Sequence, residues 1–283
     1  MQGKTVLITG GNDGIGKQTA IGLAQRGAHV VIACRNMHKA AKAVQTIKTE
    51  SENEQVEALH LDLASLASVK KGAEAFHAKY DKLDVLINNA GLFTSNLQKT
   101  EEGFERQFGV NHLGHFLLTR LLLPQLQASD DPRVLNVSSN GHYGGNIDFD
   151  NLRGERGENQ YNGFAAYSQS KLMNVMFAKE LSRRYPNIVS HALHPGVVST
   201  SIGQKYSNWL VKFFWWVSRL FMLSQKRGAE TSIYLASAPE AGEISGRYFN
   251  ERQQEKTPNK LALDEDLTRK VWAISERFVA NFL

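Results

Sequence analysis

The chain has 283 residues, with 33 Lys and Arg against 28 Asp and Glu and a net charge of +5. Its 42% hydrophobic and 22% charged residues are typical of a globular protein and exclude disorder, collagen and coiled coil. The single cysteine, Cys34, excludes a disulfide framework within the chain and favours a reducing compartment, so we expect a cytoplasmic protein. No run of 18 apolar residues occurs, which argues against a spanning helix.

The basic residues are scattered and interleaved with Asp and Glu, and the chain has no run of five Lys or Arg. We therefore expect a solvated surface and no nucleic-acid partner, although the positive field can favour an anionic ligand. The first apolar run begins at Thr5, so we expect no signal or transit peptide before it.

Apolar runs of strand length alternate with helical patterns along the chain. The expected strands cover residues 6–8, 29–33, 56–61, 85–87, 133–137, 188–193 and 246–249. Helices are expected over residues 37–50, 65–80 and 165–185, with helical patterns through 101–128. A first helix follows the glycine-rich turn after the first strand and ends near Arg26, because Gly27 stops it.

The strands are apolar without alternation, so both faces of the sheet should be covered. Strand–helix alternation at this rhythm predicts an α/β fold with a parallel, doubly wound sheet. Because no linker, composition break or repeat interrupts the pattern, we expect a single domain over residues 1–283.

The first turn, Thr9-Gly10-Gly11-Asn12-Asp13-Gly14-Ile15-Gly16, is rich in glycine and lies between a strand and a helix. Glycines allow the backbone to approach a diphosphate, and the helix N-terminus faces its negative charge. The spacing is G-x-x-x-G-x-G and differs from the general dinucleotide fingerprint. The turn favours a nucleotide site, with a purely structural turn as the alternative.

The end of the second strand, Ala33-Cys34-Arg35-Asn36, favours NADP(H) over NAD(H). An acid at this place holds the ribose hydroxyls of NAD, but here a guanidinium stands there and can pair with a 2′-phosphate. Alternatively, Arg35 is a surface residue that starts the next helix. Lys17 can add positive charge or point to solvent.

Polar and small residues follow the third and fourth strands at the same expected edge. Asp62, before Leu63, can accept the adenine amine, or it caps the helix at 65–80. Asn88-Asn89-Ala90-Gly91 follows the fourth strand, and its small residues let a ring or ribose approach the backbone.

Tyr167 and Lys171 are four residues apart and share a helix face. A nearby ammonium should lower the phenol pKa toward neutral, so that Tyr167 exchanges a proton with a carbonyl or alcohol oxygen. Ser138-Ser139 ends the fifth strand, where a hydroxyl can bind the substrate oxygen, although an ordinary serine turn is the alternative. Asn111, inside an apolar helical stretch, organises water or satisfies a core contact.

These pieces occur in one order: TGGNDGIG (9–16), DL (62–63), NNAG (88–91), Asn111, VSS (137–139), YSQSK (167–171) and HPGVVST (194–200). Over residues 3–250 the chain resembles the classical short-chain dehydrogenase/reductase family. The resemblance implies a Rossmann-type fold, usually of seven strands, and a nicotinamide cofactor. It implies that Ser139 orients the carbonyl, Tyr167 is the acid/base, Lys171 binds the cofactor ribose and Asn111 serves a proton relay through water.

The resemblance also implies a set of cofactor-binding residues: Gly10, Asn12, Gly14, Ile15, Gly16, Arg35, Asn36, Asp62, Leu63, Asn89, Ala90, Gly91, Tyr167, Lys171, Pro195, Gly196, Val198 and Thr200. IACRN (32–36), the HPGVV run and SGRYF (245–249) are most similar to the retinol dehydrogenase-like group. That group generally prefers NADP(H) and acts on lipophilic aldehydes, ketones or alcohols. Asn36 stands where the group usually has Asp, and the long gap from Ser139 to Tyr167 suggests an inserted loop over 143–164.

Residues 209–223, WLVKFFWWVSRLFML, hold twelve apolar residues of fifteen. They are expected to belong to a substrate lid within 200–227, with a subunit interface, peripheral membrane contact or core packing as alternatives. The resemblance implies a homo-oligomer. His112 and His115 lack a third ligand, so no metal site is expected. Cys34 can have a low thiol pKa but is more simply an apolar filler.

The expected function is that of an NADP(H)-dependent oxidoreductase for a small lipophilic carbonyl or alcohol. A non-enzymatic NADP(H)-binding redox sensor on the same fold is the main alternative, although a sensor need not keep the Tyr-Lys-Ser-Asn set. An epimerase or dehydratase of the extended branch is a third hypothesis, which the chain length and glycine spacing disfavour.

Overall fold

The computed structural model describes residues 1–197 and 223–283. Its centre is one parallel sheet of seven strands in the order β3-β2-β1-β4-β5-β6-β7. The strands are β1 (Thr5–Thr9), β2 (His29–Cys34), β3 (Val56–His60), β4 (Val85–Asn88), β5 (Arg133–Val137), β6 (Val189–Leu193) and β7 (Tyr248–Phe249). The doubly wound α/β prediction and all seven expected strands are thereby confirmed, with ends shifted by one or two residues.

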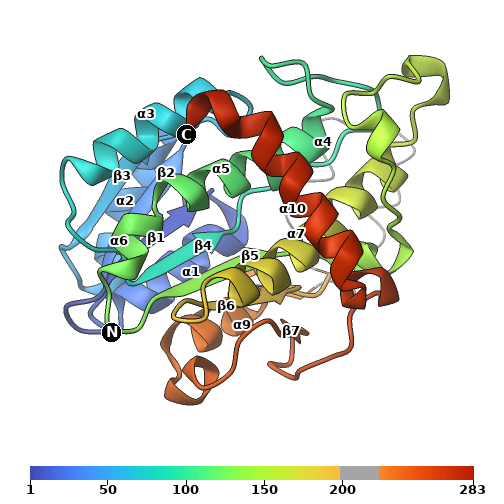
Figure 1. Cartoon of the computed structure of the whole chain (residues 1–283). Coiled ribbons are helices and arrows are strands. Elements are labelled where there is room, and N and C mark those ends of the chain that lie inside the picture. Colours follow the sequence, from blue (N-terminus) through green and yellow to red (C-terminus); the bar gives the residue numbers. More distant parts are fainter. Residues whose placement is uncertain (198–222) are drawn as a thin grey trace.

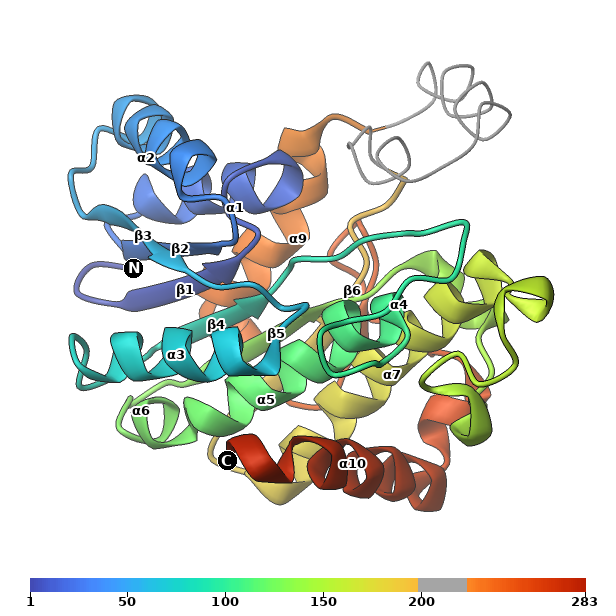
Figure 2. The same cartoon turned by 90° about the horizontal axis from the view of Figure 1, so that it is seen from above.

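Helices cover both faces of the sheet (Figures 1 and 2). One face carries α1 (Gly14–Ala24), α2 (Met37–Ser51) and α9 (Gln225–Ser237). The other face carries α3 (Leu66–His77), α5 (Gly114–Leu121), α6 (Leu123–Gln127) and α7 (Gly163–Arg184), and α10 (Glu265–Val279) lies outside α7.

The strand sequences explain this double cover. Val6 and Ile8 are buried in the core under α1 and α2, whereas Leu7 is buried in the core under α3, α5 and α7. Successive side chains of a strand point to opposite faces, so an apolar run buries itself only between two helical layers.

Short polar residues set the helix starts. The side chains of Asn36, Ser65 and Asn162 accept backbone N–H groups at the starts of α2, α3 and α7. The alternative in which Asp62 caps the helix at 65–80 is therefore wrong, because Ser65 is the cap.

The helical patterns expected through 101–128 correspond to several short helices that begin at Arg106. Residues 101–105 lie outside any helix, and α4 (Arg106–Phe108) leads into a π-helical turn at Gly109–Leu113 before α5 begins. Pro124 in the first turn of α6 then separates α5 from α6, because proline lacks the N–H that a continuous helix needs.

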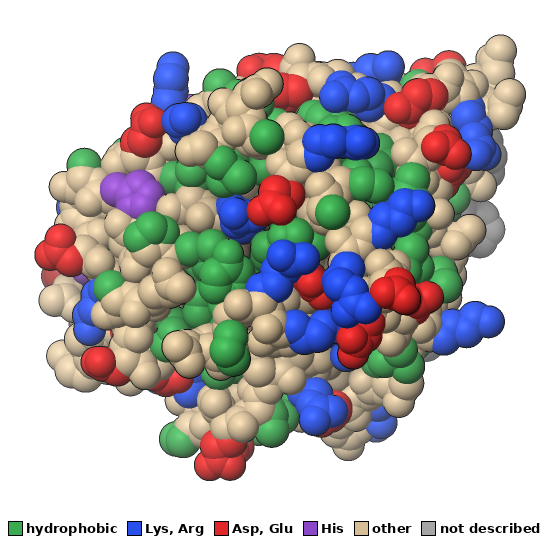
Figure 3. All heavy atoms as spheres, viewed as in Figure 1, with side chains coloured by type: hydrophobic (Ala, Val, Ile, Leu, Met, Phe, Trp, Pro, Cys, Tyr) green, Lys and Arg blue, Asp and Glu red, His purple; other side chains and the backbone are tan. Residues whose placement is uncertain are grey.

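The surface mixes charges of both signs. On the face with α10 in front, Lys and Arg are interspersed with Asp and Glu (Figure 3). Within residues 1–197 and 223–283, no helix combines the length and the hydropathy that a membrane crossing requires.

Candidate active site

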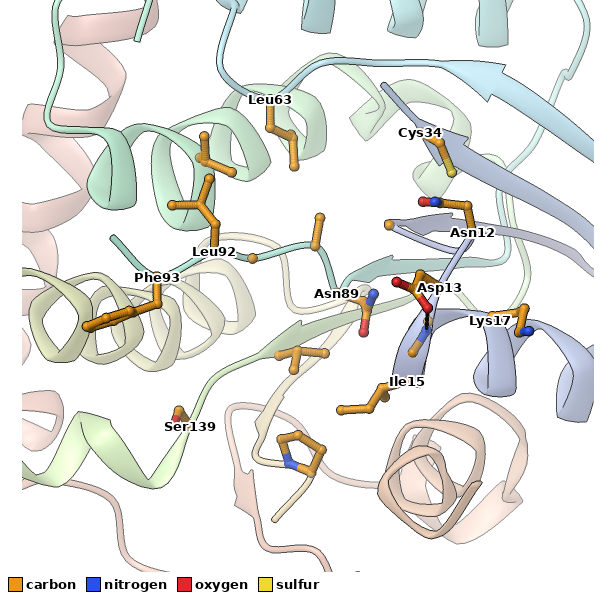
Figure 4. Close-up of a pocket in the computed structure, with 18 of the residues that line it drawn as sticks. Asn12, Asp13, Ile15, Lys17, Cys34, Leu63, Asn89, Leu92, Phe93 and Ser139 are labelled. Atoms are coloured by element: carbon orange, nitrogen blue, oxygen red, sulfur yellow. Dashed lines mark hydrogen bonds between the residues drawn. The ribbon is translucent and has the colours of Figure 1, made fainter. Parts of the chain in front are cut away.

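A cavity of about 800 Å³ opens beside the carboxyl ends of the strands. It lies where the strand order reverses between β1 and β4, the place at which open α/β sheets bind their ligands. Figure 4 shows Asn12, Lys17 and Cys34 around one end and Phe93 and Ser139 around the other. Its walls include sixteen residues of the expected set: Gly10, Asn12, Gly14, Ile15, Gly16, Arg35, Asp62, Leu63, Asn89, Ala90, Gly91, Ser139, Tyr167, Lys171, Pro195 and Gly196.

The glycine turn is compact, and its backbone angles and its close contacts both require glycine. Gly10 and Gly14 have φ angles of +67° and +56°, which disfavour other residues. A Cβ at Gly16 would lie 2.4 Å from the carbonyl oxygen of Gly10. Asp13 Oδ1 accepts the N–H of Gly14 at 2.8 Å and caps α1 (Figure 4). The turn thus brings bare backbone and the N-terminus of α1 to the cavity, which fits a diphosphate.

Thr9 and Asn89 join this turn to the end of β4. Thr9 Oγ1 accepts the N–H groups of Asn89 and Ala90, both at 3.0 Å, and Asn89 Nδ2 donates to the Thr9 carbonyl at 2.8 Å. A Cβ at Gly91 would lie 3.2 Å from Lys171 Nζ, so a larger residue there would crowd the lysine. These contacts fix the cavity floor between the two strands.

His112 and His115 each have ring nitrogens within hydrogen-bond distance of protein atoms. His115 Nε2 lies 2.8 Å from Thr9 Oγ1 and His115 Nδ1 lies 3.0 Å from the Asn111 carbonyl, while His112 Nε2 lies 2.9 Å from Ser275 Oγ. Burial lowers the pKa of His112 to about 4 and that of His115 to about 3, so both rings are neutral. Among the residues that the structure describes, no cluster of metal-binding side chains is found.

The far end of the cavity is basic. Arg35 Nη1 lies 3.8 Å from Asp62 Oδ2, and Lys17, Lys39 and Lys42 also line the wall. Sequence reasoning missed Lys39 and Lys42, although their positions four and seven residues after Arg35 place them on the near face of α2. The basic end suits an anionic group.

Two neighbouring residues, Asn36 and Cys34, have structural roles at this end. Asn36 is not among the lining residues; its Oδ1 accepts the N–H of Lys39 at 2.9 Å and caps α2. Burial raises the pKa of the Cys34 thiol to about 12, so the low-pKa hypothesis is wrong and the thiol is an apolar filler.

Ser139, Tyr167 and Lys171 come together at the other end of the cavity. Ser139 follows β5 and its Oγ accepts the N–H of Gly141 at 3.1 Å. Lys171 Nζ donates to the Val137 carbonyl at 2.9 Å and lies 5.8 Å from the centre of the Tyr167 ring. The side chains expected to do the chemistry therefore share one wall.

The acid–base properties differ from the expectation for Tyr167. Burial raises its pKa, and a hydrogen bond with Ser139 offsets part of the rise. The expected lowering by Lys171 is not found; instead, burial lowers the pKa of Lys171 itself to about 8. Tyr167 is thus a protonated phenol at neutral pH, which is the form that donates a proton.

Asn111 supports the wall from behind, and it does not line the cavity. Its Oδ1 accepts the N–H of Leu92 at 2.8 Å, and its Nδ2 donates to the Leu92 carbonyl and to Ser170 Oγ, both at 3.0 Å. The side chain therefore makes contacts within the protein, and its part in a proton relay through water stays a prediction.

An apolar wall flanks Tyr167, which sequence reasoning did not find. Phe93 lies 4.8 Å from the Phe164 ring and 5.9 Å from the Tyr167 ring, measured between ring centres. Leu92 and Val110 complete it. Because these residues come from three separate segments, no local pattern signals them.

A buried polar cluster holds the start of α7 behind this wall. Gln107 Nε2 donates to Tyr161 Oη at 2.8 Å and to the Gly163 carbonyl at 2.9 Å, and Tyr161 Oη donates to Glu105 Oε1 at 2.8 Å. Burial raises the pKa of Glu105. The cluster fixes the helix that carries Tyr167.

Part of the expected site lies outside the described residues. This applies to Val198, to Thr200 and to residues 200–222 of the expected lid. Of the remainder of the lid range, Leu223 packs beside Ile15, and residues 225–227 begin α9.

Known proteins resemble this chain over nearly its whole length. A family model described as short chain dehydrogenase matches residues 4–149. The human protein named Retinol dehydrogenase 13 is 47% identical over 98% of this chain and 85% of its own. Human Retinol dehydrogenase 14 is 44% identical over 99% of this chain and 87% of its own.

Solved structures agree with the fold. An uncharacterized protein from Mycobacterium paratuberculosis has a TM-score of 0.79 and 34% identity, covering 99% of this chain and 94% of its own. The 3-ketoacyl-(acyl-carrier-protein) reductase from Brucella melitensis, complexed with NADH, has a TM-score of 0.66 and 28% identity, covering 88% and 96%. The chain therefore belongs to the short-chain dehydrogenase family, within its retinol dehydrogenase-like group, and is an oxidoreductase that interconverts CH–OH and C=O groups of a small molecule with a nicotinamide cofactor.

Proposed function

We propose that the protein is an NADP(H)-dependent oxidoreductase for lipophilic aldehydes, ketones or alcohols. The observation that carries the proposal is the arrangement of one cavity, with Arg35, Lys39 and Lys42 at one end and Ser139, Tyr167 and Lys171 at the other. A dinucleotide with a 2′-phosphate matches this distribution of charge, because guanidinium and ammonium groups bind phosphate.

The residues present fit such a cofactor. The bare backbone at Gly10, Gly14 and Gly16 suits the diphosphate, and Arg35 with Lys39 suits the 2′-phosphate. Asp62 is available for the adenine amine, and Lys171 for a ribose hydroxyl. When bound, the nicotinamide supplies or accepts the hydride.

The chain's own residues handle the proton and the substrate oxygen. Tyr167 donates its phenolic proton to the carbonyl oxygen during reduction, and in the reverse direction its phenolate accepts the proton of the alcohol. Ser139 holds the same oxygen by a hydrogen bond. The raised pKa of Tyr167 keeps the donor form at neutral pH.

The substrate class rests on the apolar wall. Leu92, Phe93, Val110 and Phe164 stand beside the acid–base residue, so a bulky apolar carbonyl gains contact there. The names of the relatives extend the proposal to retinoids, with retinal as the first candidate.

Four broader predictions accompany this proposal. A single domain over 1–283, a cytoplasmic location, a homo-oligomer and peripheral membrane contact through 209–223 stay predictions. Sedimentation velocity tests the oligomer. Flotation with lipid vesicles tests the membrane contact. The protein should not float with the vesicles if 209–223 serves the substrate alone.

The function is tested by following NADPH and NADH consumption in parallel against small aldehydes, quinones, steroids and retinal. We expect turnover with NADPH and a bulky apolar carbonyl. Cofactor binding without turnover of any of these carbonyls would contradict the proposed substrate class.

A further inference from the structure

His194 follows directly after β6, next to Pro195–Val197 of the cavity wall. The Gly196 N–H donates to His194 Nδ1 at 3.1 Å, and His194 Nε2 lies 3.2 Å from Glu251 Oε2. Because Nδ1 accepts, the ring proton is on Nε2, the nitrogen that lies close to the Glu251 carboxylate. Within the described part of the chain, Nδ1 is bound by Gly196 and Nε2 faces Glu251, so these two contacts favour one tautomer and one orientation of the ring.

The backbone at Gly196, to which His194 is bound, has a conformation and surroundings that only glycine fits. Gly196 has a φ of +81°, and a Cβ there would lie 2.6 Å from Leu223 Cδ1 and 3.2 Å from Glu251 Cβ. The position requires glycine for conformation and for space. Glycine is also free to leave that conformation, and the bond from its N–H to His194 restrains it. The Leu223 N–H, which donates to the Val197 carbonyl at 2.9 Å, restrains the next residue.

The surroundings keep the imidazole neutral. His194 is 4% exposed and stacks on Tyr248, with ring centres 6.0 Å apart. Among the described residues, the titratable groups facing it are Glu251, whose other oxygen lies 3.6 Å from Arg252 Nε, and Tyr248 with His142 next to it. Burial lowers the pKa of His142 to about 4, so that ring is neutral. Burial lowers the pKa of His194, partly offset by Glu251, and the neutral ring is the form that accepts from Gly196.

We propose that His194, oriented by Glu251, is a positioning residue that holds Pro195–Val197 in the shape required by the nicotinamide half of the cofactor. This rests on the proposed binding of a nicotinamide dinucleotide in the cavity. His194 acts through Gly196, since it does not itself line the cavity. The adenosine half lies against other segments and should not depend on it.

The test compares two ligands in two variants of the full chain. NADPH and 2′-phospho-ADP-ribose, which lacks only the nicotinamide, are titrated calorimetrically. In His194→Asn, the amide oxygen stands near the place of Nδ1 and keeps the acceptor for Gly196. His194→Gln places its amide near Nε2 and loses that acceptor, so it is the matched counterpart.

We expect His194→Gln to raise the Kd of NADPH roughly two- to ten-fold, the loss of one hydrogen bond, with 2′-phospho-ADP-ribose unchanged. His194→Asn should stay near the wild type for both ligands. Equal weakening of both ligands, unchanged NADPH binding, or equal effects of Asn and Gln would overturn the proposal. If the wild type prefers NADH, the same comparison with NADH and ADP-ribose tests His194, so a failed NADP(H) preference is seen separately.

Discussion

Replacing Arg35 with Asp should reverse the cofactor preference. Arg35 stands at the end of β2, with its side chain 57% exposed and 3.8 Å from Asp62, so it can turn toward a phosphate without breaking a buried contact. A hydrogen bond to a charged group contributes about 1.5–3 kcal/mol, which corresponds to roughly 10- to 150-fold in affinity. The new carboxylate also repels the 2′-phosphate and can accept ribose hydroxyls, so this range is a lower bound for the change in the NADPH/NADH ratio.

The assay is kcat/KM for NADPH and for NADH at fixed substrate, repeated at low and high salt. Arg277→Asp on α10 is the matched control, because it changes the net charge equally at an exposed site that does not line the cavity. The NADPH effect of Arg35→Asp should shrink at high salt. An unchanged NADPH/NADH ratio, or an equal shift in the control, would refute the assignment of Arg35 to the phosphate.

Three further predictions follow from the site and the core. Tyr167→Phe should abolish turnover while the Kd of NADPH is kept, and substantial residual turnover would remove Tyr167 from the proton-transfer role. Gly16→Ala should weaken NADPH binding strongly, because its Cβ meets the Gly10 carbonyl oxygen at 2.4 Å; unaltered binding by calorimetry would contradict the tight turn. Because burial lowers the pKa of His112 to about 4, below the unfolded value of about 6.5, the unfolded chain binds more protons and stability falls as pH drops from 6.5 toward 4. Urea unfolding at pH 7 and at pH 5 measures this loss of stability, which should be smaller in His112→Gln than in the wild type. An identical loss in both would exclude His112 as a source of the pH dependence.

The sheet could be predicted because each strand is marked by a run of apolar residues that are adjacent in the sequence. Runs such as Val6-Leu7-Ile8 are apolar on both faces, which only a covered parallel strand requires. The order of the strands then brings the glycine turn, Asp62 and Asn89 to one edge. Their meeting in one cavity follows from the topology.

The failures have physical causes. The break of the 101–128 pattern depends on the π-helical turn that seats Asn111 against Leu92, a contact between distant segments. The pKa of Tyr167 depends on burial, which outweighs the lysine and is not visible in a spacing of four residues. The helix α10 was missed although Asp264 caps it and Val271, Trp272 and Ser275 recur on its buried face.

The most direct test of the proposed function is the fate of the hydride. NADPH deuterated at both C4 positions is incubated with the protein and retinal, and the alcohol is analysed by mass spectrometry. We predict one deuterium at the former carbonyl carbon, with less label from deuterated NADH and none with Tyr167→Phe. Unlabelled alcohol, or a faster reaction with NADH, would contradict the account.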